Sequence, residues 1–143
     1  MIFLDSNVVV AFIADDHERH FRSNSFIIEE TRKETTFAVS PQVMGEAFRA
    51  LTSPSGVEHP ISAEEFLRSS ERMLQASNFY MLSPGKTAFF IAVKTAVKLG
   101  VTSHRIFDLI LYGTMREHEI RKLATFNEKH FAKLDGIELV KIP

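Results

Sequence analysis

The run IFLDSN at residues 2–7 places a carboxylate directly after three apolar residues, and a second apolar run follows it. We expect Ile2–Asp5 to be a buried strand and Asn7–Ala14 to be a short helix with Ser6 as its candidate N-cap. A strand that passes straight into a helix is typical of parallel α/β folds. In such folds, binding sites form outside the carboxyl ends of the strands, which is where Asp5 lies.

The remainder of the chain continues this alternation of strands and helices. Short apolar runs predict further strands at residues 37–39, 78–81, 122–125 and 137–142. Capping signals and apolar spacing predict helices at about residues 15–33, 41–52, 62–76, 84–99, 105–118 and 128–133. This order predicts an α/β protein, a three-layer α/β/α sandwich around a mostly parallel central sheet. Because no repeat or linker interrupts the pattern, we expect residues 1–143 to form a single domain.

The composition excludes several kinds of protein. The chain has 143 residues, of which 45% are apolar, which is enough for a sizeable core that is rich in phenylalanine. It contains no cysteine, so disulfides and thiolate-bound zinc or iron–sulfur clusters are excluded. No segment approaches the roughly 18 apolar residues of a membrane span, and no basic leader precedes an apolar stretch. We therefore expect a cytoplasmic protein with no membrane segment and no cleaved signal.

The overall charge argues against tight nucleic-acid binding by the surface as a whole. The chain has 17 basic and 18 acidic residues, and its net charge is −1. Nucleic-acid-binding domains are often basic. If this protein handles nucleic acid, the attraction must come from a local patch, a bound cation or a partner chain.

Three acids, Asp5, Glu46 and Asp108, interrupt apolar segments, where burial makes an ionised carboxylate costly. If the fold brings them together, they form a metal site. Carboxylate oxygens favour Mg²⁺ or Mn²⁺ over zinc. Such an ion can activate water for attack on a phosphodiester, and this chemistry needs no protein nucleophile. The sequence accordingly shows no serine–histidine–aspartate arrangement and no glycine-rich phosphate loop.

Asp5 and Glu46 also have structural alternatives. Asp5 is a candidate cap for the helix that follows it, in competition with Ser6. Glu46 is three residues from Arg49, a spacing that allows an ion pair on a helix surface. The apolar neighbours of Glu46 place it at the edge of the buried face, so both roles stay open.

Asp108 is the hardest of the acids to explain without a function. Five apolar side chains surround it in IFDLIL, residues 106–111. A buried aspartate needs a partner, and Arg105 is the structural alternative. Farther along, Asn127 either caps the helix at residue 128 or orients a water with its amide oxygen. Thr125 is placed to fix the rotamer of a neighbouring carboxylate through a hydrogen bond.

The histidines give weaker indications. His17 and His20 have the spacing of a metal-binding pair on a helix, but no third ligand is near them in the sequence. His104 is better placed to meet a substrate phosphate. His118 and His130 are expected to be exposed helix residues.

Four segments, in this order, resemble the PIN-domain family: residues 1–9, 40–52, 104–111 and 123–131. The similarity extends over essentially the whole chain, and the type it most resembles is the VapC toxin of toxin–antitoxin modules. The resemblance implies a PIN-like α/β/α sandwich and an endoribonuclease that hydrolyses RNA with Mg²⁺ or Mn²⁺. It also implies a homodimer that a cognate antitoxin protein inhibits.

The resemblance also implies a role for each matching residue. Asp5, Glu46 and Asp108 match the metal-binding acidic triad, with Asp5 and Asp108 as direct ligands. Asn127 stands beside them as a residue that orients water. The supporting polar residues are Ser6, Asn7 and Thr125, and the candidates for contact with substrate phosphate are Arg49, His104 and Arg105.

Two positions depart from the family pattern. Asn127 stands where a fourth acid is common, and His130 stands at a later position that often holds an acid. The lost charge should weaken binding of a second metal, and it motivates an alternative function, a non-catalytic PIN-like module that binds RNA or a protein. A phosphatase of the haloacid dehalogenase type is disfavoured, because it needs a second aspartate where this chain has Asn7.

Overall fold

A five-stranded parallel sheet lies at the centre of the structure, a computed structural model that describes all residues from 1 to 143. Its strands are β1 (Ile2–Leu4), β2 (Phe37–Val39), β3 (Phe79–Met81), β4 (Lys122–Ala124) and β5 (Glu138–Val140). They are ordered β3-β2-β1-β4-β5, and every neighbouring pair is parallel. The parallel sheet that the sequence predicts is therefore confirmed.

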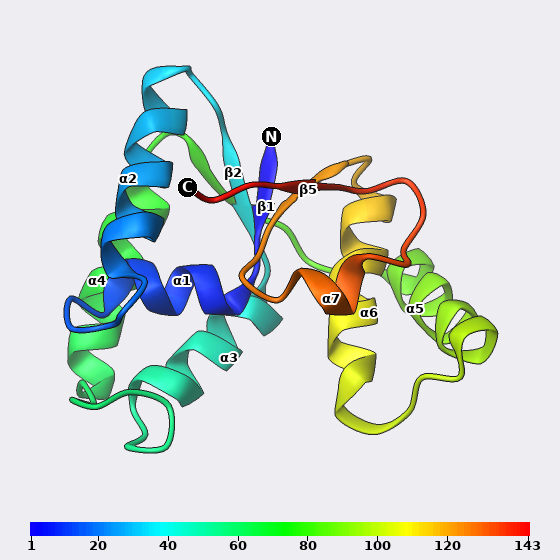
Figure 1. Ribbon diagram of the computed structural model, residues 1–143, viewed down its shortest axis with the longest axis horizontal. Coiled ribbons are helices and arrows are strands. Elements are labelled where there is room, and N and C mark those ends of the chain that lie inside the picture. The colour runs from blue at the N-terminus through cyan, green and yellow to red at the C-terminus, as the bar shows by residue number, and fades with distance from the viewer.

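Helices connect the strands and cover the sheet. They are α1 (Ser6–Ile13), α2 (His20–Arg32), α3 (Pro41–Leu51), α4 (Ala63–Gln75), α5 (Lys86–Leu99), α6 (Ile106–Glu117) and α7 (Glu128–Phe131), and a 3-10 turn, η1 (Ser103–Arg105), precedes α6. Figure 1 shows α2 and α4 on one side of the strands and α5 and α6 on the other, which is the expected α/β/α sandwich. None of these helices combines the length and the apolar character that crossing a membrane requires.

The position of β1 in the sheet explains why the chain opens with an unbroken apolar run. β1 pairs with β2 on one side and with β4 on the other. Its three residues are at most 2% exposed, because a strand inside a covered parallel sheet is buried on both faces. The core continues into α1, where Val8 and Val9 are fully buried.

The strand order reverses direction at β1. From β1 the chain moves outward through β2 to β3, and it then returns to the opposite side of β1 to form β4 and β5. Parallel sheets leave a crevice at such a switch point, outside the carboxyl ends of the two neighbouring strands. Asp5 follows β1 and Thr125 follows β4, so both side chains start at this crevice.

Two of the predicted helix starts are confirmed by their capping bonds. The Ser40 hydroxyl accepts a hydrogen bond from the Val43 amide at 3.2 Å, and Pro41 occupies the first helical position of α3. Ser62 and Glu65 form the reciprocal capping box of α4. Both signals lie within four residues of the chain, so the local sequence is sufficient to set them.

The starts of α1 and α2 differ from the prediction. α1 begins at Ser6, because the Asp5 carboxylate rather than the Ser6 hydroxyl caps it, accepting from the Ser6 amide at 2.7 Å. α2 begins at His20, well after the expected capping box at Asp15–Glu18. The Asp16 carboxylate bonds to His59 instead of to the backbone amides of a helix.

The start of α5 also differs from the prediction. The Ser-Pro pair at residues 83–84 does not begin the helix, which starts at Lys86 with Gly85 as its N-cap. The Glu117 carboxylate of α6 accepts hydrogen bonds from the amides of Gly85 and Ala88, at 2.6 and 3.3 Å. The Glu117 carboxylate, which is distant in sequence, therefore accepts the hydrogen bonds from the first amides of α5 that a local capping side chain would otherwise accept.

Candidate active site

The Asp5 carboxylate is buried at the crevice between β1 and β4, with 7% of the residue exposed. One of its oxygens accepts from the Ser6 amide at 2.7 Å. The other accepts from the Thr125 hydroxyl at 2.6 Å and from the Asn7 side-chain amide at 2.9 Å. Because β1 and β4 are in register up to Leu4 and Ala124, the residues that follow them meet directly.

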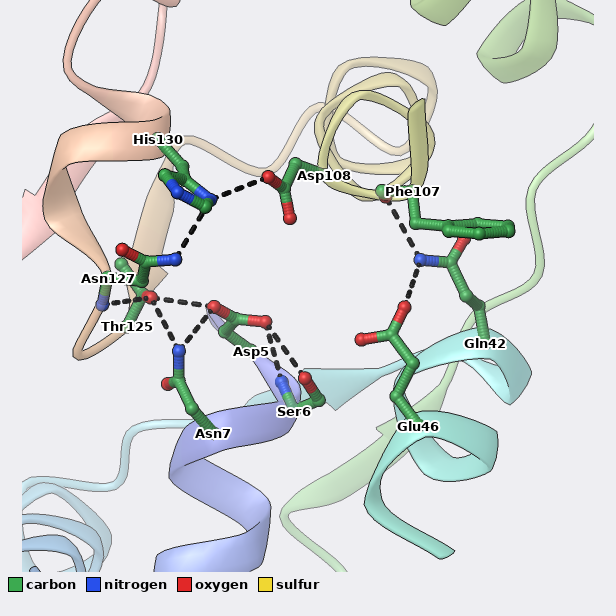
Figure 2. Close-up of polar contacts among 10 residues, drawn as sticks. All are labelled: Asp5, Ser6, Asn7, Gln42, Glu46, Phe107, Asp108, Thr125, Asn127 and His130. Atoms are coloured by element: carbon green, nitrogen blue, oxygen red, sulfur yellow. Dashed lines mark hydrogen bonds and ion pairs between the residues drawn. The ribbon is translucent and has the colours of Figure 1, made fainter. Parts of the chain in front are cut away.

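Asn7 and Thr125 join the ends of the two strands around Asp5. The Asn7 amide nitrogen also contacts the Thr125 hydroxyl at 3.2 Å, and its oxygen accepts from the Phe126 backbone N–H at 3.0 Å. Residues 118 and 119 positions apart in sequence are thereby fixed against one another. The predicted supporting residues Ser6, Asn7 and Thr125 do surround Asp5 in the structure (Figure 2).

Burial raises the pKa of Asp5 above its ordinary value of 3.8. The hydrogen bonds from Thr125 and Ser6 oppose this rise, and the negative charges of Asp108 and Glu46 add to it. Asp5 has no lysine or arginine partner among the ion pairs of the structure. The hydrogen bonds therefore satisfy its oxygens, but its negative charge is left without a counter-ion.

Asp108, in the first turn of α6, bonds to His130 of α7. The Asp108 carboxylate lies 2.8 Å from His130 Nδ1, and the two side chains are 27% and 37% exposed. The prediction that His130 is an exposed helix residue is therefore wrong, because α7 places its ring against α6 (Figure 2). The alternative pairing of Asp108 with Arg105 is not formed either, since Arg105 Nε is buried without a hydrogen-bond partner.

Asn127 occupies the N-cap position of α7, but its side chain does not cap the helix. Its amide nitrogen lies 2.8 Å from His130 Nδ1, and its backbone N–H donates to the Thr125 hydroxyl at 2.9 Å. Asn127 thus connects Thr125, which holds Asp5, with His130, which holds Asp108.

Glu46 reaches the site from α3 and is held by Gln42, one turn earlier. The Gln42 side-chain nitrogen donates to Glu46 Oε1 at 2.8 Å and to the Phe107 carbonyl oxygen at 3.0 Å. The alternative ion pair between Glu46 and Arg49 is not formed. Gln42 therefore ties α3 to the start of α6, a role that sequence reasoning missed.

A cleft of about 670 Å³ lies beside these carboxylates, between α3 and the start of α6. Its lining residues are Gln42, Gly45, Glu46, Arg49, His104, Phe107 and Asp108. An adjoining cavity of about 250 Å³ shares Glu46 and Arg49 with the cleft and extends to Ser6 and Asn7. Of the three predicted phosphate contacts, Arg49 and His104 line the cleft, and Arg105 does not.

The other histidine predictions have mixed outcomes. His17 and His20 do not form a metal-binding pair, because the His20 ring contacts the Ala11 carbonyl oxygen and the His17 ring contacts the Arg19 amide. His118 is exposed, as expected.

The three carboxylates suit a hard divalent cation, but they do not form a closed set of ligands. Figure 2 shows Asp5, Asp108 and Glu46 directed toward one space. No three His, Asp or Glu side chains are close enough to hold one ion together, because His130 and Gln42 draw two of the carboxylates to partners of their own. The donor type and the unbalanced charge nevertheless fit Mg²⁺ or Mn²⁺.

Comparisons with known proteins agree with this fold. A family model described as PIN domain matches residues 2–137. The structure is similar to that of the Mycobacterium tuberculosis toxin VapC20, described as a sarcin–ricin loop cleaving toxin. The TM-score is 0.71 and the identity 17%, over 92% of this chain and 94% of that chain.

Two complexes contain further similar chains. Neisseria gonorrhoeae FitAcB gives a TM-score of 0.66 and 18% identity, over 99% of this chain and 97% of that chain. Rickettsia felis VapBC2, bound to a promoter DNA fragment, gives a TM-score of 0.65 and 18% identity, over 98% of each chain. No curated protein sequence matches the chain. At these identities the structural neighbours show a shared fold.

Thr125→Val removes the hydroxyl that donates to Asp5 but keeps the side chain's shape. Because Thr125 is 3% exposed and hydrogen bonds to charged groups contribute roughly 1.5–3 kcal/mol, we expect the free energy of unfolding to fall by about 2 kcal/mol in urea titrations. Thr114→Val is the matched control, since Thr114 is 1% exposed and its hydroxyl donates to a neutral helix carbonyl. Equal losses in the two variants would contradict a special contribution from the bond to Asp5.

Asp5→Asn should change stability in a pH-dependent way in metal-free buffer. The folded-state pKa of Asp5 is raised, so its ionisation favours the unfolded chain, and the wild type loses stability as the pH rises from below 3.8 through that pKa. The variant cannot ionise at this position. Its free energy of unfolding relative to wild type should therefore increase between about pH 3.5 and about pH 7, measured by denaturant titration in EDTA. A difference that is constant with pH would contradict the raised pKa.

Proposed function

Because this chain belongs to the PIN-domain family, we propose that it is an Mg²⁺- or Mn²⁺-dependent endoribonuclease and the toxin of a toxin–antitoxin module. The observation that carries this proposal is the Asp5 carboxylate, which is buried without a counter-ion beside the charges of Asp108 and Glu46. Such a site is stabilised by a bound divalent ion. The VapC toxin among the structural neighbours supports the assignment as a toxin.

Asp5, Glu46 and Asp108 would hold the divalent ion once Asp108 and Glu46 move from their present partners, His130 and Gln42, toward Asp5. When bound, the ion supplies an activated water for hydrolysis of the phosphodiester and offsets the charge that develops on the phosphate. Asp5 is the fixed member of the set, because Ser6 and Thr125 hold both of its oxygens. Asp108 is oriented by His130, and Glu46 by Gln42. Asn127 is placed between these groups, where its amide can orient water or a substrate oxygen.

RNA binding by a chain with a net charge of −1 would depend on local groups in the cleft and on the bound cation, because Glu46 and Asp108 also line the cleft and repel phosphate. Arg49 and His104 line the cleft, and neither forms an ion pair. A cation at the acidic site would add to this attraction, because it reverses the local repulsion between carboxylates and phosphate. Arg105 has weaker support as a phosphate contact, because it does not line the cleft.

The partners proposed are a cognate antitoxin protein and a second copy of the chain in the cytoplasm. A structural neighbour described as a toxin–antitoxin complex, from Klebsiella pneumoniae, supports an antitoxin partner. Helix α5 supports a homodimer, because it exposes Phe89, Phe90 and Val97 at 53%, 51% and 80%. A second copy could cover this apolar surface.

A second candidate function is a non-catalytic PIN-like module that binds RNA or a protein. The replacement of acids by Asn127 and His130, and the open arrangement of the carboxylates, favour it. In that case substitution of a triad carboxylate would leave partner binding and cellular toxicity unchanged.

Asp108→Asn should reduce RNA cleavage by at least about 100-fold, an effect of the size seen when one charge-stabilising group is removed from an active site. The measurement is cleavage of a structured RNA by purified, antitoxin-free protein with Mg²⁺ or Mn²⁺. Asp135→Asn is the matched control, because the Asp135 side chain is 90% exposed and lies outside the cleft. Cleavage that survives either Asp108→Asn or excess EDTA would contradict the proposed mechanism.

Asn127→Asp should tighten Mn²⁺ binding, because it adds a carboxylate next to the residues that hold Asp5 and Asp108. Isothermal titration calorimetry of wild type and variant measures the change. Asn78→Asp is the control that adds the same charge elsewhere, since Asn78 lies before β3 and contacts Thr31. Equal affinities for wild type and Asn127→Asp would place Asn127 outside the reach of the ion.

A further inference from the structure

Phe107 is the only apolar side chain in the cleft beside the carboxylates. Its side chain lies at the start of α6 and is 48% exposed, whereas Leu109 and Leu111 of the same helix are 1% and 3% exposed. A single exposed phenylalanine is common on protein surfaces and needs no explanation by itself. Phe107 differs from such residues because it lies next to Asp108 and because its backbone is bonded to Gln42.

The backbone of Phe107 is fixed to the opposite wall of the cleft. The Gln42 side chain donates to the Phe107 carbonyl oxygen at 3.0 Å and to Glu46 at 2.8 Å. Figure 2 shows Phe107 and Asp108 leaving α6 in different directions, with Asp108 toward His130 and Phe107 toward Gln42. The backbone that carries the aromatic ring is therefore held in place relative to Glu46 and Asp108.

The cleft also contains groups that can contact an anionic, planar ligand. Arg49 and His104 line it and have no hydrogen-bond partner or ion-pair partner within the chain. A protein partner that inserted an apolar anchor would find one ring and six polar or glycine residues. An aromatic ring beside unpaired donors is instead the arrangement by which proteins hold single-stranded nucleic acid, with bases stacked on rings and phosphates on basic groups.

We propose that Phe107 stacks on an unpaired base of the RNA next to the phosphodiester that is cleaved, with Arg49 and His104 on the adjoining phosphates. This inference rests on the proposed function and assigns to Phe107 the contact with a base at that site. A base inside a duplex is stacked on both faces by its neighbours, so it has no free face for the ring.

Kinetic constants of cleavage test the proposal. Phe107→Ala should raise KM for a short unpaired RNA by about 5- to 150-fold, the range for loss of one stacked base, with kcat changed much less. Phe107→Tyr should retain the wild-type KM, because it keeps an aromatic face. Phe107→Leu should resemble Phe107→Ala, because it keeps apolar volume but cannot stack. Phe21→Ala is the control, since Phe21 is 80% exposed and lies outside the cleft.

Measuring RNA binding without cleavage tests the stacking by Phe107 separately from the proposed nuclease function. Fluorescence anisotropy with a labelled ten-nucleotide unpaired RNA, in EDTA so that no cleavage occurs, should show the same loss of affinity in Phe107→Ala, and a duplex of the same sequence should show none. An unchanged affinity for the unpaired RNA, or equal losses for both RNAs, would overturn the stacking assignment. Loss of antitoxin binding with unchanged RNA affinity would also overturn it, by assigning the ring to a protein partner. Absence of cleavage by the wild type would instead contradict the nuclease function.

Discussion

The burial of one carboxylate between two strands determines how the rest of the site is built. Asp5 directly follows the buried central strand β1 at the switch point, so the fold itself places a negative charge where water cannot solvate it well. Thr125 and Asn7 satisfy its oxygens, yet hydrogen bonds from neutral groups reduce the cost of an unbalanced charge without removing it. The same burial that makes the site unfavourable in isolation makes it favourable for a cation.

The site has a rigid side and a more adjustable side. The rigid side is the network that joins β1 to β4 through Asp5, Asn7 and Thr125. The other side consists of Asp108 and Glu46, whose partners His130 and Gln42 are partly exposed side chains of α7 and α3. Only the adjustable side also borders the cleft, so the proposed cation and the proposed substrate would contact the same two carboxylates.

Sequence reasoning was sufficient where the determining contacts are local or follow from burial. The apolar run before Asp5 and the capping box at Ser62 each specify their structure within a few residues. It failed where a distant residue decides the outcome. The start of α5 depends on Glu117, and the position of Glu46 depends on a bond that joins Gln42 to Phe107, 65 residues away. No pattern in one sequence specifies such pairs.

His130 illustrates why the site could be located but not completed from the sequence. An acid at this position would have added negative charge beside Asp108, and the imidazole instead gives Asp108 a hydrogen-bond partner. Asn127 likewise stands in place of an acid, and its neutral side-chain amide contacts the ring of His130. The two departures from the family pattern therefore lie in contact with each other, and His130 gives Asp108 a hydrogen-bond partner in place of a further negative charge. The site has three carboxylates, and two of them would have to give up or share a protein partner to hold the proposed cation. The affinity for that cation would thus depend on residues that are not themselves acidic.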